Sequence, residues 1–134
     1  MEPRKILVVD DHAAFRNSFR KLLAKLPAVG EILEAADGES AIEQVKQSAP
    51  DLVFMDITMP YLDGIEATRR ILREHPKTKI AMLTVHANKA LLEKSMEVGA
   101  LGYLAKKSIH EELAQAIEKI MNDEAYVSKA MEDY

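Results

Sequence analysis

Short apolar runs alternate along the chain with segments in which apolar residues recur every three or four positions. The apolar runs predict five strands, at residues 6–9, 32–36, 52–55, 79–84 and 102–105. The intervening segments, and the one after residue 105, have the spacing of amphipathic helices, and proline or glycine follows the first four of them. The pattern therefore predicts five strand–helix pairs in succession.

Strands that alternate with helices form a parallel sheet covered by helices on both faces. Right-handed crossovers leave few topologies. We expect an α/β, flavodoxin-like (βα)5 sandwich with a doubly wound, five-stranded parallel sheet in the order 2-1-3-4-5. Residues 1–122 account for this domain. Residues 123–134 fall outside the fifth pair and are expected to be a linker, or the start of another helix with Ser128 as its N-cap.

Composition narrows the class of protein further. The chain has 134 residues, 48% apolar and 30% charged, which is the balance of one globular domain. It has no cysteine, which excludes disulfides, thiolate metal sites and a cysteine nucleophile. Its longest apolar runs, of about four residues, are far shorter than a membrane-spanning helix needs. No signal-peptide pattern is present, so we expect a cytoplasmic protein. A net charge of −4 argues against sequence-independent nucleic-acid binding.

Polar residues follow four of the five predicted strands. Asp10 and Asp11 follow the first strand, Asp56 ends the third, Thr84 ends the fourth, and Lys106 follows the fifth. Ligands of such sheets bind at the carboxyl ends of the strands, near the point where the strand order reverses. In the expected order the first and third strands are neighbours there. We therefore expect three carboxylates, a hydroxyl and an ammonium group to converge on one rim.

Clustered carboxylates repel one another unless a cation lies between them. Because no histidine or cysteine stands at these strand ends, we expect them to bind a hard, oxygen-preferring ion such as Mg²⁺. The four histidines are scattered and are interpreted as surface or turn residues: His12, His75, His86 and His110. Neither G-x-G-x-x-G nor G-x-x-x-x-G-K-[ST] occurs, so the sequence supports no dinucleotide or nucleoside triphosphate site.

Five motifs in order resemble the receiver domain of a two-component response regulator. They are LVVDDH at 7–12, MDITMP at 55–60, DG at 63–64, Thr84, and GYLAK at 102–106. The resemblance covers about residues 4–122. The DDH motif with Phe15 and Arg16, and GALGYL at 99–104, are similar to the NarL/FixJ (LuxR-type) transcription factors.

The resemblance implies a role for each site residue. Asp56 would be the phosphoacceptor and a ligand of Mg²⁺ (or Mn²⁺). Asp11 would bind the ion directly, Asp10 through a water, and Thr58 through its backbone carbonyl. Lys106 would pair with the phosphoryl oxygens. Thr84 would be the switch hydroxyl that contacts the phosphoryl group, and Tyr103 would change rotamer on activation.

The resemblance also implies partners. A sensor histidine kinase, or a small acyl phosphate, would donate the phosphoryl group. Phosphorylation would favour a homodimer, and DNA would be bound only by a C-terminal helix-turn-helix domain beyond the linker. The outer face of the fifth helix is expected to carry solvated polar residues: Glu111, Glu112, Gln115, Glu118 and Lys119. Lys107 stands where many receivers have proline, and a cis peptide before it is not expected because a non-proline cis bond costs ~3 kcal/mol.

Three other interpretations remain open at this point. A phosphatase of the haloacid-dehalogenase type also uses an aspartate nucleophile with Mg²⁺, but its general acid would lie two residues further on, where this chain has Thr58. We therefore expect no turnover of an external substrate. A stand-alone receiver acting on a protein target would share all the site residues. A structural pseudo-receiver is disfavoured because none of those residues is missing.

Overall fold

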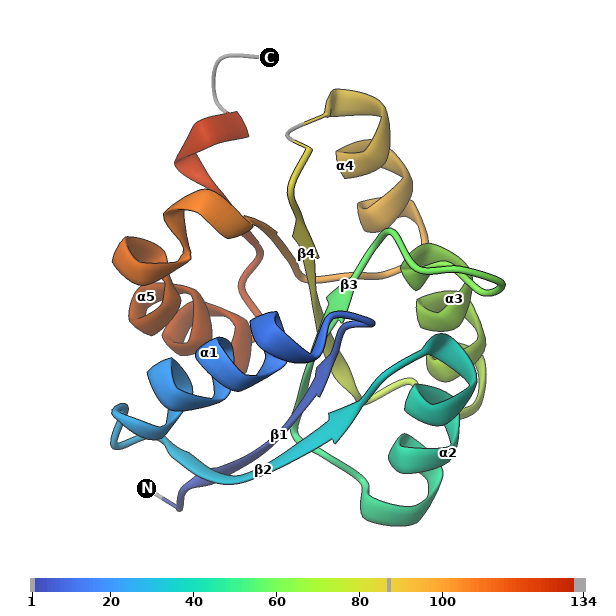
Figure 1. Cartoon of the computed structure of the whole chain (residues 1–134). Coiled ribbons are helices and arrows are strands. Elements are labelled where there is room, and N and C mark those ends of the chain that lie inside the picture. The colour runs from blue at the N-terminus through green and yellow to red at the C-terminus, as the bar shows by residue number, and fades with distance from the viewer. Residues whose placement is uncertain (1, 87, 132–134) are drawn as a thin grey trace.

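A central parallel sheet carries helices on both faces (Figure 1) in the computed structural model, which describes residues 2–86 and 88–131. Its strands lie in the order β2-β1-β3-β4-β5-β6. Their bounds are Arg4–Val9 (β1), Val29–Ala35 (β2), Leu52–Asp56 (β3), Lys79–Thr84 (β4), Gly102–Ala105 (β5) and Tyr126–Val127 (β6). The predicted doubly wound order of the first five strands is confirmed.

Five α-helices of the described part of the chain cover the sheet. They are α1 (Ala13–Ala24), α2 (Gly38–Ser48), α3 (Gly64–Glu74), α4 (Lys89–Glu97) and α5 (Ile109–Met121), with short 3-10 turns at Lys106–Ser108 and Lys129–Met131. Alternate residues of β1 face opposite sides, as the pleat requires. Leu7 lies in the core beneath α2, α3 and α4, and Ile6 in the core beneath α1 and α5. In the described residues no helix has the length and apolarity to cross a membrane.

The loops at the carboxyl end of the sheet are held by helix caps. Asp37, Asp63 and Asn88 each accept a backbone N–H at the start of α2, α3 and α4. The first residue of α3 is a glycine, Gly64, and a Cβ at this position would lie 2.2 Å from the carbonyl oxygen of Asp56. The loop between β3 and α3 therefore closes tightly against the end of β3.

The prediction for the segment after α5 is wrong in one respect. It is not only a linker, because Tyr126–Val127 forms a sixth strand parallel to β5. The sheet thus has six strands rather than five. Tyr126, Ser128 and Met131 are buried. A 3-10 turn, Lys129–Met131, does begin directly after Ser128, whose carbonyl accepts the Met131 N–H, but the Ser128 hydroxyl donates to the carboxylate of Glu112. Pairing with a distant strand is a tertiary contact that a two-residue apolar pattern does not reveal.

Glu112 is buried and not on the solvated face of α5, so that expectation is also wrong. Its carboxylate accepts hydrogen bonds from Ser108 Oγ (2.8 Å), Tyr126 Oη (2.9 Å), the Lys129 N–H (2.9 Å) and Ser128 Oγ. We call these five residues the Glu112 cluster. Burial would raise the pKa of Glu112, but the four hydrogen bonds together hold it below its ordinary value. The cluster fastens the segment after α5 to the domain.

Candidate functional site

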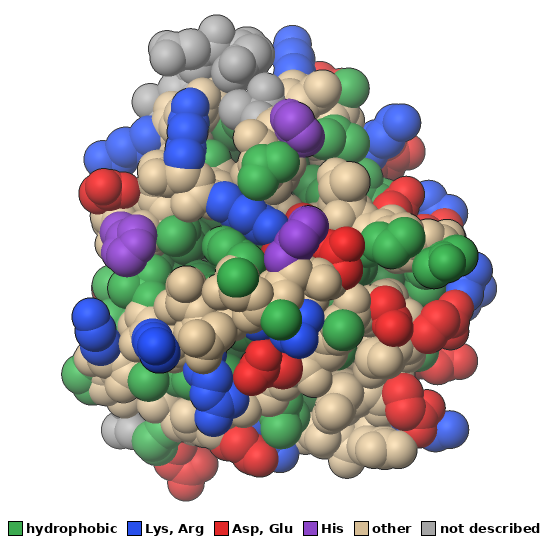
Figure 2. Space-filling model, viewed as in Figure 1, with side chains coloured by type: hydrophobic (Ala, Val, Ile, Leu, Met, Phe, Trp, Pro, Cys, Tyr) green, Lys and Arg blue, Asp and Glu red, His purple; other side chains and the backbone are tan. Residues whose placement is uncertain are grey.

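The expected convergence of carboxylates at the end of the sheet is confirmed. Asp10, Asp11, His12 and Asp56 each offer a ligand atom, and these atoms lie within 4.8 Å of one another. The register that pairs Val9 with Met55 brings the residues after β1 beside the end of β3. Figure 2 shows acidic, histidine and basic side chains close together on the face that carries these strand ends.

Asp10 is fully buried and held from three directions. Its Oδ2 lies 2.6 Å from Lys106 Nζ, its Oδ1 accepts the His12 N–H at 2.8 Å, and its carbonyl accepts from Arg16 Nη1 at 2.6 Å. Both carboxylate oxygens therefore have protein partners. Sequence reasoning did not find the role of Arg16, which becomes visible only when α1 folds back over the end of β1.

Asp56 is almost completely buried, with 4% of its surface exposed. Burial and the negative charges of Asp10 and Asp11 raise its pKa from an ordinary 3.8 to about 6, against the opposing charge of Lys106. Lys106 Nζ lies 3.5 Å from Asp56 Oδ1. At neutral pH the carboxylate is thus ionised, yet more basic than an ordinary aspartate. Such a group is suited to nucleophilic attack.

Lys106 bridges the two buried aspartates from the end of β5. Its ammonium group also lies 4.2 Å from the ring centroid of Phe15, and Phe15 stacks on Phe19 at 5.5 Å. The Phe15 ring therefore contacts the same ammonium group that pairs with the two aspartates. These ring contacts come from α1 and were not predicted.

His12 corrects the sequence analysis in part. Its side chain is 72% exposed, as expected for a surface residue, but its Nδ1 lies 3.3 Å from Asp10 Oδ1 and 3.2 Å from Asp11 Oδ1. The cluster therefore contains a histidine. The cause is local: the His12 backbone N–H turns back onto Asp10 Oδ1, and this turn carries the ring over the cluster.

Thr84 and Tyr103 meet at the loop between β4 and α4. The Thr84 hydroxyl donates to the carbonyl of His86 at 3.1 Å and accepts the His86 N–H at 3.0 Å. Tyr103 is fully buried, and its hydroxyl lies 3.4 Å from the His86 carbonyl and 3.3 Å from that of Asn88. Burial raises the pKa of Tyr103. The two side chains thus contact the same loop.

Comparison with known proteins decides the family. The model of the response regulator receiver domain matches residues 6–118. The chain belongs to the response regulator receiver family. The receiver domain is 38% identical to the response regulator UvrY of Escherichia coli over 123 residues, which is 92% of this chain and 56% of that protein. It is 36% identical to the response regulator GacA of Pseudomonas aeruginosa over 124 residues, 92% of this chain and 58% of that protein.

A solved structure resembles the receiver domain over nearly its whole length. The crystal structure of a LuxR-family two-component response regulator from Aurantimonas matches with a TM-score of 0.94 and 36% identity, over 98% of this chain and 94% of that one. The chain spans about half the length of the curated relatives it matches. The relatives include a transcriptional regulatory protein, DegU of Brevibacillus brevis. The resemblance to the receiver domain of two-component response regulators is therefore confirmed.

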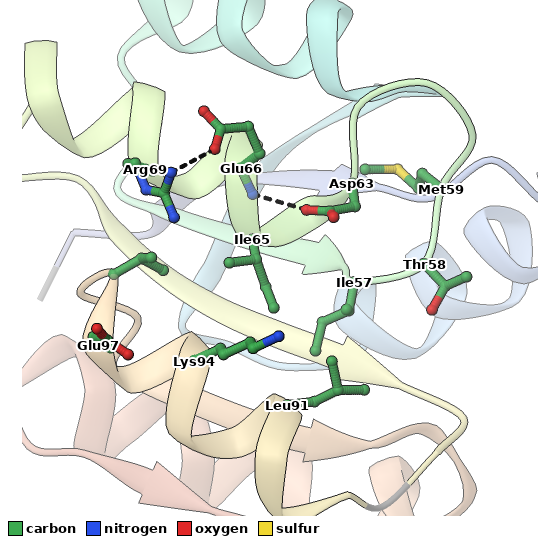
Figure 3. Close-up of a pocket in the computed structure, with 11 residues that line it drawn as sticks. Ile57, Thr58, Met59, Asp63, Ile65, Glu66, Arg69, Leu91, Lys94 and Glu97 are labelled. Carbon is green, nitrogen blue, oxygen red and sulfur yellow. Dashed lines mark hydrogen bonds and ion pairs between the residues drawn. The ribbon is translucent and has the colours of Figure 1, made fainter.

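A groove of about 820 Å³ lies between α3 and α4 of the receiver domain (Figure 3), and its lining includes Ile57 and Thr58, which directly follow Asp56. Ile57, Ile65 and Leu91 provide apolar lining, and Thr58 of the β3–α3 loop lies at one end. Arg69 on its α3 side is paired with the neighbouring helix residue Glu66. Thr58 thus lines the groove two residues after Asp56. The peptide bond between Lys106 and Lys107 is trans, and no cis peptide bond occurs among the described residues.

Proposed function

We propose that Asp56 of this receiver domain accepts a phosphoryl group from a sensor histidine kinase. A carboxylate oxygen attacks phosphorus, a P–O bond forms, and the P–N bond of the donor phosphohistidine breaks, so that the electron pair returns to the imidazole. The observation that carries this proposal is the buried Asp56 beside Lys106 and two further aspartates. We expect the exchange in the cytoplasm, where the ATP that charges kinases is found.

The donor set fits Mg²⁺ (or Mn²⁺), because three carboxylates gather their oxygens within 4.8 Å. Asp11 and Asp56 would bind the ion directly, with the backbone carbonyl of Thr58. Asp10 suits contact through a water, since its two oxygens already accept from Lys106 and the His12 backbone. When bound, the ion supplies positive charge that offsets the charge on the transferring phosphoryl group.

Lys106 and Thr84 are proposed to bind the phosphoryl oxygens once they are in place. Lys106 already lies between Asp10 and Asp56, so its ammonium needs little movement. The Thr84 hydroxyl would exchange its bond to the His86 carbonyl for one to a phosphoryl oxygen. Because Tyr103 contacts the same loop carbonyl, it would respond to that change. These successive changes would switch the conformation of the β4–α4 surface.

The altered surface is proposed to act on transcription. Phosphorylation would favour a homodimer, and DNA would be bound by a C-terminal helix-turn-helix domain, with residues 123–134 leading toward it. The relatives support this proposal because they are about twice as long and include a transcriptional regulatory protein. The receiver domain itself would turn over no external substrate, phosphorylation and dephosphorylation of Asp56 being its only chemistry.

Intact-mass spectrometry tests the proposal. Incubation with acetyl phosphate and Mg²⁺ should add one phosphoryl group, and the addition should disappear in Asp56→Asn and in the presence of a chelator. Labelling of Asp56→Asn to the same extent would refute the assignment. Sustained release of phosphate from p-nitrophenyl phosphate would instead favour a phosphatase of the haloacid-dehalogenase type.

A further inference from the structure

Two exposed hydrophobic side chains lie near the strand end that carries Asp56. Within residues 2–86 and 88–131, only two large hydrophobic side chains are strongly exposed, Tyr61 at 105% and Val85 at 65%. Tyr61 lies in the loop after β3 and Val85 directly after β4, and these two strands are neighbours. Figure 2 shows hydrophobic side chains protruding over the β3–α3 loop. Both exposed side chains therefore flank the same strand ends.

The backbone at Tyr61 is strained. Its φ is 69°, and the N–H of Leu62 donates to the carbonyl of Pro60 at 2.8 Å. A hydrogen bond across three residues with a positive central φ is the rarer, strained form of the γ-turn. A residue with a Cβ is less stable in this conformation than glycine. The exposed ring recovers none of that stability through burial.

The other left-handed residues that carry a side chain have an ordinary explanation. Among the described residues these are Ala49 and Asp123, and both follow the end of a helix. There a left-handed residue lets the chain bond back to the last helical carbonyls, as Ala49 does to Val45. Tyr61 ends no helix. Strain of this kind, held by the surrounding structure, points to a function for the side chain.

Tyr61 is presented by an anchored loop. The N–H of Gly64 donates to the carbonyl of Ile57 at 2.8 Å and closes the loop at its base. Met59 and Leu62, two residues before and one residue after Tyr61, are buried at 6% and 8% exposure. The loop therefore exposes the Tyr61 ring while Met59 and Leu62 are buried.

We infer that Tyr61 is a contact residue for the protein that delivers the phosphoryl group to Asp56, and that its ring enters an apolar recess beside the donor's phosphohistidine. This inference rests on the proposed function. Asp56 is 4% exposed, so a macromolecular donor must press its surface onto the rim around Asp56 to reach the carboxylate. A ring projecting from that rim then meets the donor first. Tyrosine is also a residue type enriched among the strongest contacts of interfaces.

The test compares a protein donor with a small donor that has the same scissile bond. The small donor is phosphoimidazole, which carries a P–N bond but no protein surface. The protein donor is the autophosphorylated phosphotransfer region of a sensor histidine kinase from the same genome, selected because it labels the wild-type chain. Tyr61→Gly removes the ring and the strain, and Tyr61→Phe keeps the ring as a matched control.

We expect kcat/KM for the protein donor to fall about tenfold or more in Tyr61→Gly and less than threefold in Tyr61→Phe. The rate with phosphoimidazole should stay within twofold of wild type in both variants, and the melting temperature of Tyr61→Gly should not fall. Equal loss with both donors, no loss with either, or a lowered melting temperature would overturn the inference. So would loss of self-association in Tyr61→Gly, which would make a second copy the occupant. Failure of phosphoimidazole to label wild-type Asp56 would instead overturn the proposed function.

Discussion

Replacing Glu112 by glutamine should loosen the segment after α5 and lower the stability of the domain. The carboxylate is 5% exposed and accepts four hydrogen bonds. An amide keeps one acceptor oxygen, which can serve Tyr126 Oη and the Lys129 N–H. Its NH2 group then faces the hydroxyls of Ser108 and Ser128, which can rotate to accept. All four groups can still hydrogen-bond residue 112, two of them now as acceptors, but the charge is lost.

The magnitude follows from that loss of charge. A hydrogen bond to a charged acceptor contributes about 1.5–3 kcal/mol and a neutral one about 0.5–1.5 kcal/mol. Summed over the four bonds, the difference would be several kcal/mol. The segment can, however, leave the sheet and rehydrate its donors, so the free energy of docking limits the loss. We expect a decrease of about 1–2 kcal/mol in the free energy of unfolding at pH 7. Glu111→Gln, on the exposed face of the same helical turn, should stay within about 0.5 kcal/mol of wild type.

The effect should depend on pH with a definite sign. The hydrogen bonds hold the pKa of Glu112 below its ordinary value of 4.5 in the folded state. The stability it contributes is therefore fully present above the unfolded-state pKa and is lost as the pH falls through the folded-state pKa. The difference between wild type and Glu112→Gln should be largest at pH 7 and should shrink below about pH 4.5.

Urea unfolding at pH 7 and below about pH 4.5 measures the free energies of unfolding. Amide hydrogen exchange shows which segment is destabilised. The amides of Tyr126 and Ser128 donate to the carbonyls of Leu101 and Tyr103, so they report whether β6 is docked. They should exchange faster in Glu112→Gln while the amides of β1 and β3 remain protected. Equal stability of Glu112→Gln and Glu111→Gln at pH 7, with unchanged exchange at Tyr126, would refute the reasoning.

Four further outcomes are expected. Asp56→Asn should raise the free energy of unfolding by about 2–3 kcal/mol at pH 7. The pKa of Asp56 is raised to about 6 in the folded state, so the wild-type protein loses stability as the pH rises from 4 to 6 and the asparagine variant does not. Urea titrations that show no gain in stability at pH 7 would contradict this. Asp11→Ala should weaken Mg²⁺ binding more than Asp10→Ala does, as calorimetry can measure, and equal affinities would count against direct ligation by Asp11. Thr84→Ala should still accept a phosphoryl group but lose the amide NMR shifts around Tyr103 that beryllofluoride induces; a complete set of shifts would show that Thr84 is not the relay. Residues 1–134 should bind no operator DNA at moderate salt, phosphorylated or not, and retention in a mobility-shift assay would contradict a DNA contact made only by a further domain.

Local patterns were sufficient to predict most of the fold. The periodicities of apolar residues predicted five strands and five helices. The handedness of crossovers left few topologies, and the flavodoxin-like order expected among them is the one observed for the first five strands. Because parallel strands end at one edge of the sheet, the positions of Asp10, Asp56 and Lys106 at strand ends also predicted that they would meet. The receiver motifs agreed with that geometry, and the family comparison confirmed the family.

Only the tertiary structure decided which distant groups become partners. Glu112 lies beside the apolar stripe of α5, so its position on the helix is compatible with either exposure or burial, and three of its four donors come from residues 126–129. Likewise Asp10 and Lys106 are 96 positions apart, and their 2.6 Å contact depends on where β5 ends relative to β1. The left-handed φ of Tyr61 is set by the buried neighbours and the closed base of its loop. Periodicity records which face a residue prefers, whereas the partner of a buried charge and the sign of a loop dihedral are fixed by contacts between segments far apart in the chain.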